Sequence, residues 1–459
     1  MTTAPLPPVR RVTAADVRAA LAGARRVVFL DDDPTGTQTV RDLPVLTRWT
    51  VEDVRWALRQ DTAGFFVLTN TRSLAPADAA ARDREVVTAC LRAAEGEGAG
   101  LVFASRSDST LRGHFPLETD VIGEVLAQHG DTVDAVVLAP AFTDAGRVTL
   151  GGTHYLRSAD GLTPVADTEF AKDATFGFTS SRLADWVTEK SAGRIPAADV
   201  TELTLDDIRG GTTQSLCDRL NGVVVLDTAE DDDLRAGVLA ILAAEEAGKT
   251  LVYRVGPSFV RARTGQDATP PIEDDTLATL LRPDAHGLVV VGSHVGLTSR
   301  QLARLGERRH FAHVELDVPA ILDDAEDHIH DAVARAVEAL GSDLVVLSTS
   351  RKLVAGADEA ESLDIARRVS AALTTTARRI VQARRPAFVV AKGGITSSDV
   401  ATVSLGIDRA WVRGSMLPGI VSLWEPVSGP ARGLPYVVFA GNVGDENSLA
   451  DVIDRLEAL

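Results

Sequence analysis

Acidic, hydroxyl and guanidinium side chains gather in four short segments of the first half of the chain. These segments are 31–36 (DDDPTG), 69–73 (TNTRS), 105–113 (SRSDSTLRG) and 140–147 (PAFTDAGR). Carboxylates can accept hydrogen bonds from sugar hydroxyls, whereas arginines can hold a carboxylate, bidentately where the geometry permits. A small polyhydroxy acid needs both kinds of group, so we expect such an acid to bind here. The candidate substrate-binding residues are Asp32, Asp33, Thr35, Gly36, Arg72, Arg106, Asp108, Ser109, Thr110, Arg112 and Gly113.

Each of these segments, taken alone, also has an ordinary structural explanation. Residues 31–33 could form a solvated acidic loop, and Arg106 and Arg112 could pair with surface acids. A ligand explains the set better because a predicted strand directly precedes each segment. The carboxyl ends of parallel strands meet at one edge of an open sheet, and ligands bind in the crevice there.

Glycine-rich turns with small hydroxyl side chains follow three predicted strands of the second half. They are 292–298 (GSHVGLT), 393–398 (GGITSS) and 441–446 (GNVGDE). Such turns let backbone N–H groups approach an anion closely, which favours a nucleotide phosphate. Neither GxxxxGK[ST] nor GxGxxG occurs, and each turn alone is weak evidence because glycine is common in tight turns. The candidate nucleotide-binding residues are Gly292, Ser293, Thr298, Lys392, Gly393, Gly394, Thr396, Gly441, Asn442 and Gly444.

The elements that position these segments are short, continuously apolar runs rich in β-branched residues. Because they are apolar on both faces, they predict strands of parallel sheets covered by helices, and the intervening segments, such as 76–94, have helical spacing. Residues 156–211 show few clear strands and are expected to cover the first sheet. The predicted strands are 27–30, 65–68, 101–104, 135–139, 223–226, 251–253, 288–291, 314–316, 344–347, 388–390 and 436–439.

At 459 residues the chain is long for one hydrophobic core, so two domains are expected. The polar stretch 265–275 (GQDATPPIEDD) has two prolines and no periodicity, which is typical of a linker. We predict an α/β fold with an N-terminal substrate-binding domain (1–264), a linker (265–285) and a C-terminal nucleotide-binding domain (286–459). Each domain is predicted to be a mainly parallel sheet flanked by helices, with the active site in the cleft between them.

The composition of the chain limits the classes of binding partner and the cellular compartment that we expect. The 47 basic and 65 acidic residues give a formal net charge of −18, which disfavours nucleic acid and anionic membranes as partners. Cys90 and Cys217 are far apart and are expected to be two buried thiols. The N-terminal segment lacks the apolar core of a signal peptide, and no apolar run could span a bilayer. A cytoplasmic protein is expected, and the sequence leaves open whether it forms a homodimer.

At these residues the sequence resembles the four-carbon acid sugar kinase family, whose members phosphorylate threonate, erythronate or 3-oxo-tetronate. Residues 32–36 resemble the family's DDxTG turn, and 108–113 match its DSTLRG loop, the most specific signature. The stretch 140–155 resembles its PAF…GR…GxxxY pattern, and 292–301, 393–396, 418–419 and 441–445 follow in the family's order. The resemblance implies ATP, Mg²⁺ and transfer of the γ-phosphate to a terminal hydroxyl of a four-carbon sugar acid.

Three departures from the family pattern concern the phosphate and substrate contacts. Ala440 stands about where relatives have lysine, residues 292–295 read GSHV instead of GSxS, and 173–181 lacks an expected proline. Lys392 could replace the missing charge, or it could point to solvent beside Arg384 or Arg385.

The proton acceptor and the metal ligands are less clear than the two binding sites. Asp108 and Asp445 are the candidates for the group that takes the hydroxyl proton, and no metal ligand is identified. A protein that senses nucleotide and sugar acid without turnover is the alternative from another class. An NAD-linked dehydrogenase is weaker because no dinucleotide fingerprint occurs.

Overall fold

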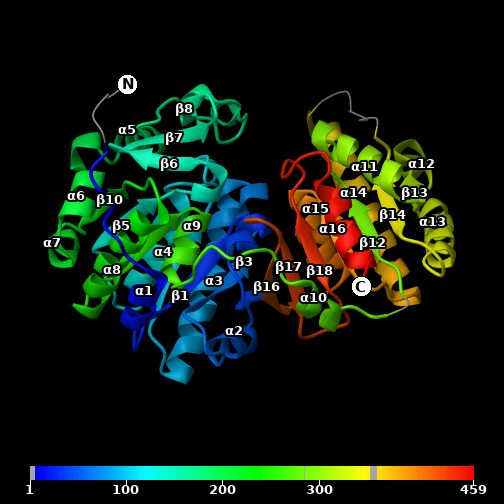
Figure 1. The fold of residues 1–459 in the computed structure, drawn as a ribbon, viewed down its shortest axis with the longest axis horizontal. Helices are drawn as coiled ribbons and strands as arrows, with labels where there is room; N and C mark the ends of the chain where they lie inside the picture. Colours follow the sequence, from blue (N-terminus) through cyan, green and yellow to red (C-terminus); the bar gives the residue numbers. More distant parts are fainter. Residues whose placement is uncertain (1–5, 284, 352–358) are drawn as a thin grey trace. The chain divides into compact units, whose positions relative to one another are not determined.

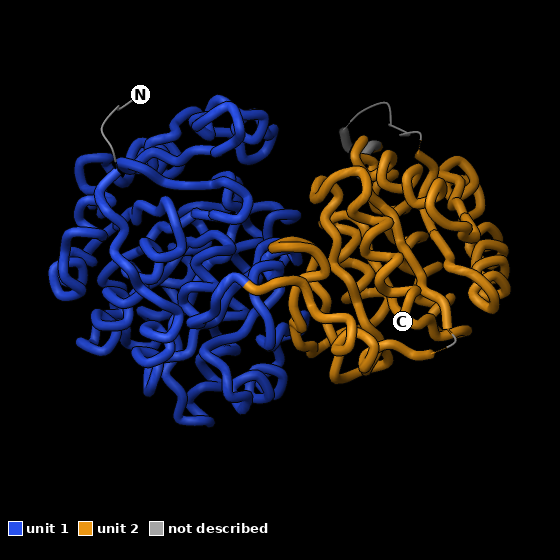
Figure 2. Tube along the Cα trace, viewed as in Figure 1, with its two compact units in different colours: residues 1–268 blue, residues 269–459 orange. Residues whose placement is uncertain are grey.

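The computed structural model describes residues 6–283, 285–351 and 359–459 (Figure 1). It divides into two compact units, residues 1–268 and residues 269–459 (Figure 2). Both units are α/β, as predicted. Each is described by itself below.

The first unit contains a parallel sheet whose strands carry the predicted substrate residues at their carboxyl ends. Each neighbouring pair is parallel, and the register sets Asp31 of β1 beside Arg106 of β4. Every strand predicted for this unit is present. The order is β2 (Leu43–Leu46), β3 (Gly64–Leu68), β1 (Arg26–Asp31), β4 (Leu101–Arg106), β11 (Leu251–Val255), β5 (Ala135–Ala139), β10 (Gly222–Leu226) and β9 (Val200–Leu203).

Helices α2 (Val51–Leu58), α3 (Pro76–Glu97) and α4 (Leu117–Gln128) share one core with this sheet. Helix α3 begins with proline at its first turn, where the missing N–H is not needed, and ends at Gly98 in the left-handed region (φ 63°). Its buried side chains pack with sheet residues such as Phe65 and Phe103. The other helices of the unit are α1 (Ala14–Ala20), α5 (Leu183–Lys190), α6 (Leu205–Gly210), α7 (Thr213–Asp218), α8 (Asp231–Glu246) and α9 (Pro257–Arg263).

A small antiparallel sheet, absent from the predicted strands, follows β5. It consists of β6 (Arg147–Leu150), β7 (Thr153–Ser158) and β8 (Gly161–Pro164), and short 3₁₀ turns at Val165–Asp167 and Glu169–Lys172 come after it (Figure 1). The region 156–211 is only partly the cover that was expected, because its strand β9 joins the main sheet beside β10. The part before β9 packs on Leu111 and Phe115, which belong to the DSTLRG segment and its continuation.

The second unit contains a mixed sheet. Its parallel part holds the predicted strands, whereas β17 and β16 form an antiparallel hairpin that the prediction missed. The order is β13 (Ala312–Leu316), β14 (Val345–Thr349), β12 (Leu288–Val291), β15 (Val389–Lys392), β18 (Tyr436–Phe439), β17 (Ile420–Pro426) and β16 (Arg409–Leu417).

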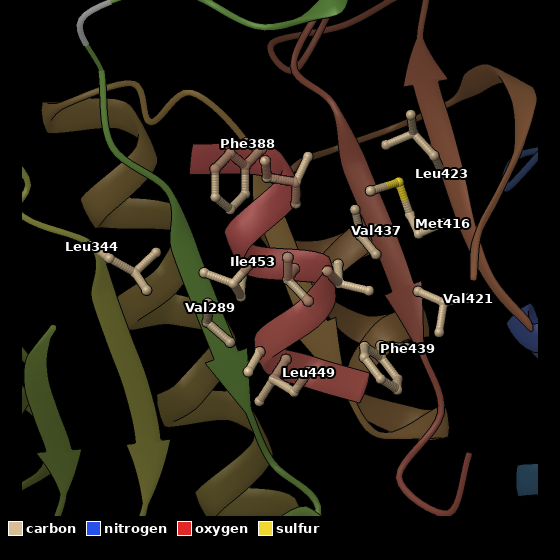
Figure 3. Close-up of a cluster of buried hydrophobic side chains, with 14 of the residues drawn as sticks. Val289, Leu344, Phe388, Met416, Val421, Leu423, Val437, Phe439, Leu449 and Ile453 are labelled. Carbon is tan, nitrogen blue, oxygen red and sulfur yellow. The ribbon is translucent and has the colours of Figure 1, made fainter. Parts of the chain in front are cut away.

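The core of this unit forms where α16 (Ser448–Glu457) lies on the sheet. Figure 3 shows Leu449 and Ile453 of α16 against Val289, Val437 and Phe439. Helix α10 (Asp274–Leu280) lies within the predicted linker and places Leu277 in the same core. The other helices are α11 (Gly296–Arg308), α12 (Val318–Asp323), α13 (Ala325–Ala339), α14 (Glu359–Ala383) and α15 (Gly394–Asp399), which continues as a π-helical turn (Val400–Ser404).

Two sequence-based expectations about the chain as a whole can be compared directly with the structure. Cys90 and Cys217 are free and buried, as expected. None of the helices in the described ranges is long and apolar enough to cross a membrane.

Candidate active site

The acidic turn after β1 meets arginines from the two neighbouring strands. Asp32 accepts two hydrogen bonds from Arg72, at 3.0 Å from Nε and 2.5 Å from Nη2. Asp31 forms an ion pair with Arg106 in which both side chains are almost fully buried. Asp33 lies 3.6 Å from Arg72, and its carbonyl accepts from Arg106. The structure thus brings together predicted residues from β1, β3 and β4.

Gly36 is required where the following 3₁₀ turn (Pro34–Thr39) crosses the Asp31–Arg106 pair. A Cβ at this position would lie 2.2 Å from Asp31 Oδ1 and 2.3 Å from Arg106 Nε, closer than real atoms approach. Asp33 caps the turn by accepting from the Thr35 N–H at 2.9 Å. Thr35 and Gly36 therefore shape the acidic turn.

The DSTLRG segment folds back on itself through its own charges. Asp108 Oδ2 accepts from Arg112 Nε at 2.7 Å and from the Thr110 hydroxyl. Burial raises the pKa of Asp108, but Arg72, Arg112 and the Thr110 hydrogen bond together hold it well below its usual range. Asp108 is therefore a strong hydrogen-bond acceptor and a weak base.

Two buried residues that the prediction missed hold this segment from behind. Arg254 of β11 donates to the carbonyls of Asp108 (3.2 Å) and Arg112 (3.0 Å). His154 Nε2 donates to the Ser109 carbonyl at 2.8 Å, and its Nδ1 accepts from Thr149 at 2.9 Å. Burial lowers the pKa of His154 to about 4, so its ring is neutral at physiological pH. An arginine inside an apolar strand was the available sequence signal for Arg254.

Arg147, at the start of β6, lies beside the same segment. Its Nη1 donates to the Ser109 hydroxyl at 2.9 Å, and its guanidinium lies 5.7 Å from the ring centres of both Phe142 and Phe170. Arg112 lies 5.3 Å from the Phe170 ring centre. Two arginines therefore share one aromatic ring.

A buried carboxylate on α4 connects the segments that follow β3 and β4. Glu118 accepts hydrogen bonds from the hydroxyls of Thr71 (2.8 Å), Ser105 (2.6 Å) and Ser107 (3.2 Å). Burial raises the pKa of Glu118. Because helix α4 lies outside the predicted loops, the sequence offered no sign of this connection.

In the second unit, the three glycine-rich turns come together. Thr298 Oγ1 lies 3.2 Å from Ser293 Oγ and 3.0 Å from the Gly441 carbonyl, to which it can donate. A Cβ on Gly441 would lie 2.4 Å from Ser293 Oγ. Gly393 has φ 131°, and a Cβ there would lie 2.8 Å from Thr396 Oγ1. We call these turns, 292–298, 393–398 and 441–446, the glycine cradle.

The third turn of the glycine cradle is held by Gln301, whose Nε2 donates to the carbonyls of Val443 (3.1 Å) and Asp445 (2.7 Å). Asp445 Oδ1 accepts from Ser448 Oγ and from the N–H groups of Asn447 and Ser448. These hydrogen bonds, that of the Ser448 side chain foremost, lower the pKa of Asp445. Its carboxylate thus caps the start of α16 and has little affinity for a proton.

Lys392 is buried at the end of β15, so the alternative that it points to solvent beside Arg384 or Arg385 is wrong. Its Nζ donates to the Ala440 carbonyl at 2.5 Å and lies 3.7 Å from the centre of the Phe439 ring. Burial lowers its pKa to about 7. The ammonium thus lies next to Ala440, where the family pattern led us to expect a lysine.

A second cation contacts the cradle. Arg351, which follows β14, donates to the Ser293 carbonyl and, at 2.8 Å, to the Ser299 hydroxyl. The prediction missed Arg351 because no glycine-rich turn marks its strand end. Within the described ranges, no group of three or more His, Cys, Asp or Glu side chains could hold a metal ion.

Comparison with known proteins identifies the two halves. A sugar-binding N-terminal domain family matches residues 27–263, and a nucleotide-binding C-terminal domain family matches residues 288–449. A D-threonate kinase of Bordetella bronchiseptica is 31% identical over 83% of this chain and 84% of its own length. The chain belongs to the four-carbon acid sugar kinase family. This kinase is therefore a phosphotransferase that acts on a sugar acid and uses a nucleotide.

Other relatives of this kinase differ in the acid they are named for. A D-erythronate kinase of Heliobacterium modesticaldum is 28% identical over 85% of this chain and 86% of its own length. A 3-oxo-isoapionate kinase of Paraburkholderia graminis is 31% identical over 56% of this chain and 57% of its own length.

Solved structures share the fold of this kinase. A Salmonella typhimurium LT2 protein has a TM-score of 0.65 and 18% identity, covering 93% of this chain and 98% of that one. The Haemophilus influenzae protein HI1011 has a TM-score of 0.60 and 17% identity, covering 94% and 99%.

Proposed function

We propose that this kinase transfers the γ-phosphoryl group of ATP to a terminal hydroxyl of a four-carbon sugar acid of the threonate, erythronate or 3-oxo-tetronate type. The observation that carries the proposal is that two ion pairs, Asp32–Arg72 and Asp108–Arg112, lie at the carboxyl ends of neighbouring parallel strands, at one edge of the sheet. Carboxylates for hydroxyls and guanidinium groups for a carboxylate are the two kinds of group that a sugar acid requires.

The first unit supplies the substrate site in this proposal. Asp32, Asp33 and Asp108 accept hydrogen bonds from substrate hydroxyls, while Arg112, whose side chain is 24% exposed, binds the carboxylate. Arg106 is only 3% exposed and is occupied by Asp31, so we assign it to positioning the acidic turn instead. The proposal thus places the substrate-binding domain in residues 1–264.

The second unit, with the nucleotide-binding domain proposed for residues 286–459, supplies the site for ATP. In the cradle, a Cβ on Gly292, Gly393, Gly441 or Gly444 would come within 3.0 Å of a neighbouring side chain. Such crowded turns beside a buried lysine fit a chain of phosphates. Ser293, Thr298, Gly393, Gly394, Thr396 and Gly441 would surround the phosphates, and Lys392 and Arg351 would supply positive charge. Mg²⁺, which usually binds through phosphates and few carboxylates, would neutralise phosphate charge when it arrives with ATP.

The chemistry asks the protein mainly for alignment and charge neutralisation, because phosphoryl transfer has a loose transition state. Asp108 and Asp445 were the candidate proton acceptors, but their lowered pKa values make both weak bases. We assign Asp108 to orienting the reacting hydroxyl through a hydrogen bond, and Asp445 to shaping the third turn of the cradle.

A turnover assay tests the proposal. The purified enzyme is mixed with MgATP and each of D- and L-threonate, D- and L-erythronate and 3-oxo-tetronate, and ADP release is followed with a coupled assay. We expect acid-dependent ADP release with at least one of these acids, and none with neutral four-carbon polyols. ADP release with no acid present, or none with any acid, would contradict the proposal.

A further inference from the structure

The arginines of the substrate site differ in what balances their charge. Arg72 is paired with Asp32 and Asp33, Arg106 with Asp31, and Arg112 with Asp108 and Asp173. Among the described side chains, no carboxylate lies within 4.0 Å of the guanidinium of Arg147 or of Arg254. Arg254 is 1% exposed and donates to two backbone carbonyls, whereas Arg147 is only partly buried and donates to the Ser109 hydroxyl. The Nε of Arg147 is buried and has no hydrogen-bond partner.

A partly buried guanidinium without a carboxylate partner is costly, because it loses hydration without gaining a counter-charge. What surrounds Arg147 is one hydroxyl, of Ser109, and the faces of Phe142 and Phe170. Aromatic faces attract a cation but do not neutralise it. A small anion arriving at this point would supply the missing charge and accept hydrogen bonds from the guanidinium.

The surroundings of Arg147 are built to hold it in place. Gly146 has φ 71°, and a Cβ there would lie 2.4 Å from the Arg157 carbonyl, so the turn that aims Arg147 requires glycine. Ser109 is held through its carbonyl by His154. Ala171, next to Phe170, is buried in the same cluster as Leu111 and Phe115, which anchors the aromatic wall on the DSTLRG segment.

We infer that Arg147 determines specificity for acids by binding the substrate carboxylate together with Arg112 and the Ser109 hydroxyl. This inference rests on the proposed function and extends it, because it places one end of the substrate. Phe170 forms the wall of this subsite, and both guanidinium groups lie against it. The segment 173–181, which departs from the family pattern, follows directly, and its Asp173 contacts Arg112 at 3.5 Å.

The test compares Arg147→Met with Arg157→Met, a control at an exposed arginine of β7 in the same small sheet. Methionine keeps much of the length of arginine and its contact with the aromatic rings but removes the charge. kcat/KM is measured for the preferred sugar acid and for its neutral amide. We expect Arg147→Met to lower kcat/KM for the acid about 100-fold or more while changing that for the amide less than about threefold. The Arg157→Met enzyme should resemble the wild type with both.

Two further measurements separate binding from structural support. Calorimetric titration of the sugar acid without nucleotide should show binding to the wild type, much weaker binding to Arg147→Met and an intermediate value for Arg147→Lys. The Tm of ligand-free Arg147→Met should equal or exceed that of the wild type, because a partly buried charge without a carboxylate partner has been removed.

The outcomes also distinguish this inference from the proposed function. Equal losses with acid and amide, a lower Tm, or unchanged acid binding in Arg147→Met would overturn the role of Arg147. A wild-type protein that binds the acid but does not phosphorylate it would contradict the proposed function, while the titrations would still decide the role of Arg147. A wild type that neither binds nor phosphorylates any of the acids would overturn both.

Discussion

The charged side chains of the two candidate sites differ in their partners. In the first unit, the carboxylates of Asp31, Asp32 and Asp108 are paired with guanidinium groups, which fixes the positions of these donors and acceptors. In the second unit, Lys392 is buried against an aromatic ring and a carbonyl, and it has no carboxylate among its described partners. Substitutions of single residues should therefore separate the two sites.

Replacing Arg112 by alanine should damage turnover far more than folding. Loss of a charge-assisted contact to the substrate should raise the barrier by about 2–4 kcal/mol, visible as a lower kcat/KM for the sugar acid. Arg84→Ala, which removes an exposed pair with Glu124, is the control and should leave kinetics unchanged. Near-normal activity of the Arg112→Ala enzyme would show that this arginine does not hold the carboxylate.

Removing Lys392 should raise the KM for ATP and lower kcat together. The Nζ of Lys392 donates to the Ala440 carbonyl, so the backbone of residue 440 lies next to this ammonium. A lysine introduced at position 440 would therefore begin from a backbone position close to the charge that was removed. The double variant Lys392→Ala with Ala440→Lys should therefore recover part of the lost activity in steady-state assays. If the effects of the two changes are additive, without rescue, the two positions serve different sites.

The same lysine should make the stability of the ligand-free protein depend on pH. Burial lowers the pKa of Lys392 from 10.5 to about 7, so between these values the unfolded state binds a proton that the folded state lacks. Stability therefore increases as pH rises through this window, by up to about 1.4 kcal/mol per pH unit. Denaturant unfolding at pH 7 to 10 should show this slope in the wild type but not in Lys392→Met. Parallel curves for both proteins would contradict it.

Among the elements, the tight turns after strands depend on glycines that admit no side chain. Gly36→Ala would force its Cβ against the Asp31–Arg106 pair, and we expect a loss of about 1–3 kcal/mol in the free energy of unfolding. Gly98→Ala is not an equivalent change, because Gly98 has φ 63° but open space around it. Gly123→Ala, within α4 and free of close contacts, is the better control in chemical denaturation. A Gly36→Ala protein as stable as wild type would mean that the turn can shift.

Continuous apolar runs predicted most of the parallel strands, because a strand covered on both faces has no polar alternation. The same criterion missed β16 and β17, whose arginine, serine and glutamate residues interrupt the apolar pattern. It also missed two parallel strands, β2, which contains proline, and β9, which contains threonine and glutamate. The short strands of the small sheet were missed as well.

The sequence predicted those parts of the candidate site that follow from the strand topology alone. Carboxyl ends of parallel strands converge, so the segments after β1, β3 and β4 had to meet. Residues that reach the site from elsewhere could not be found this way. Arg254 extends from within a strand, and Glu118 and Gln301 extend from helices, so their contacts depend on side-chain packing.

For the whole molecule, the two proposed sites predict separate patterns of ligand protection. Hydrogen exchange followed by mass spectrometry should show that a sugar acid alone protects residues 31–36, 69–73 and 105–113, because it ties these loops together. A nonhydrolysable ATP analogue alone should protect 292–298, 393–398 and 441–446. Protection of 393–398 by the acid alone would contradict this division of the sites.

The two buried thiols can report how often the first unit opens. Cys90 on α3 and Cys217 on α7 are both buried, and the chain has no other cysteine. A thiol-reactive dye can therefore modify the protein only when the first unit opens and exposes a cysteine. The labelling rate reports the frequency of these openings, and the second unit does not contribute because it contains no cysteine. A bound sugar acid should slow this reaction, so affinity can be followed from dye uptake without any enzymatic assay.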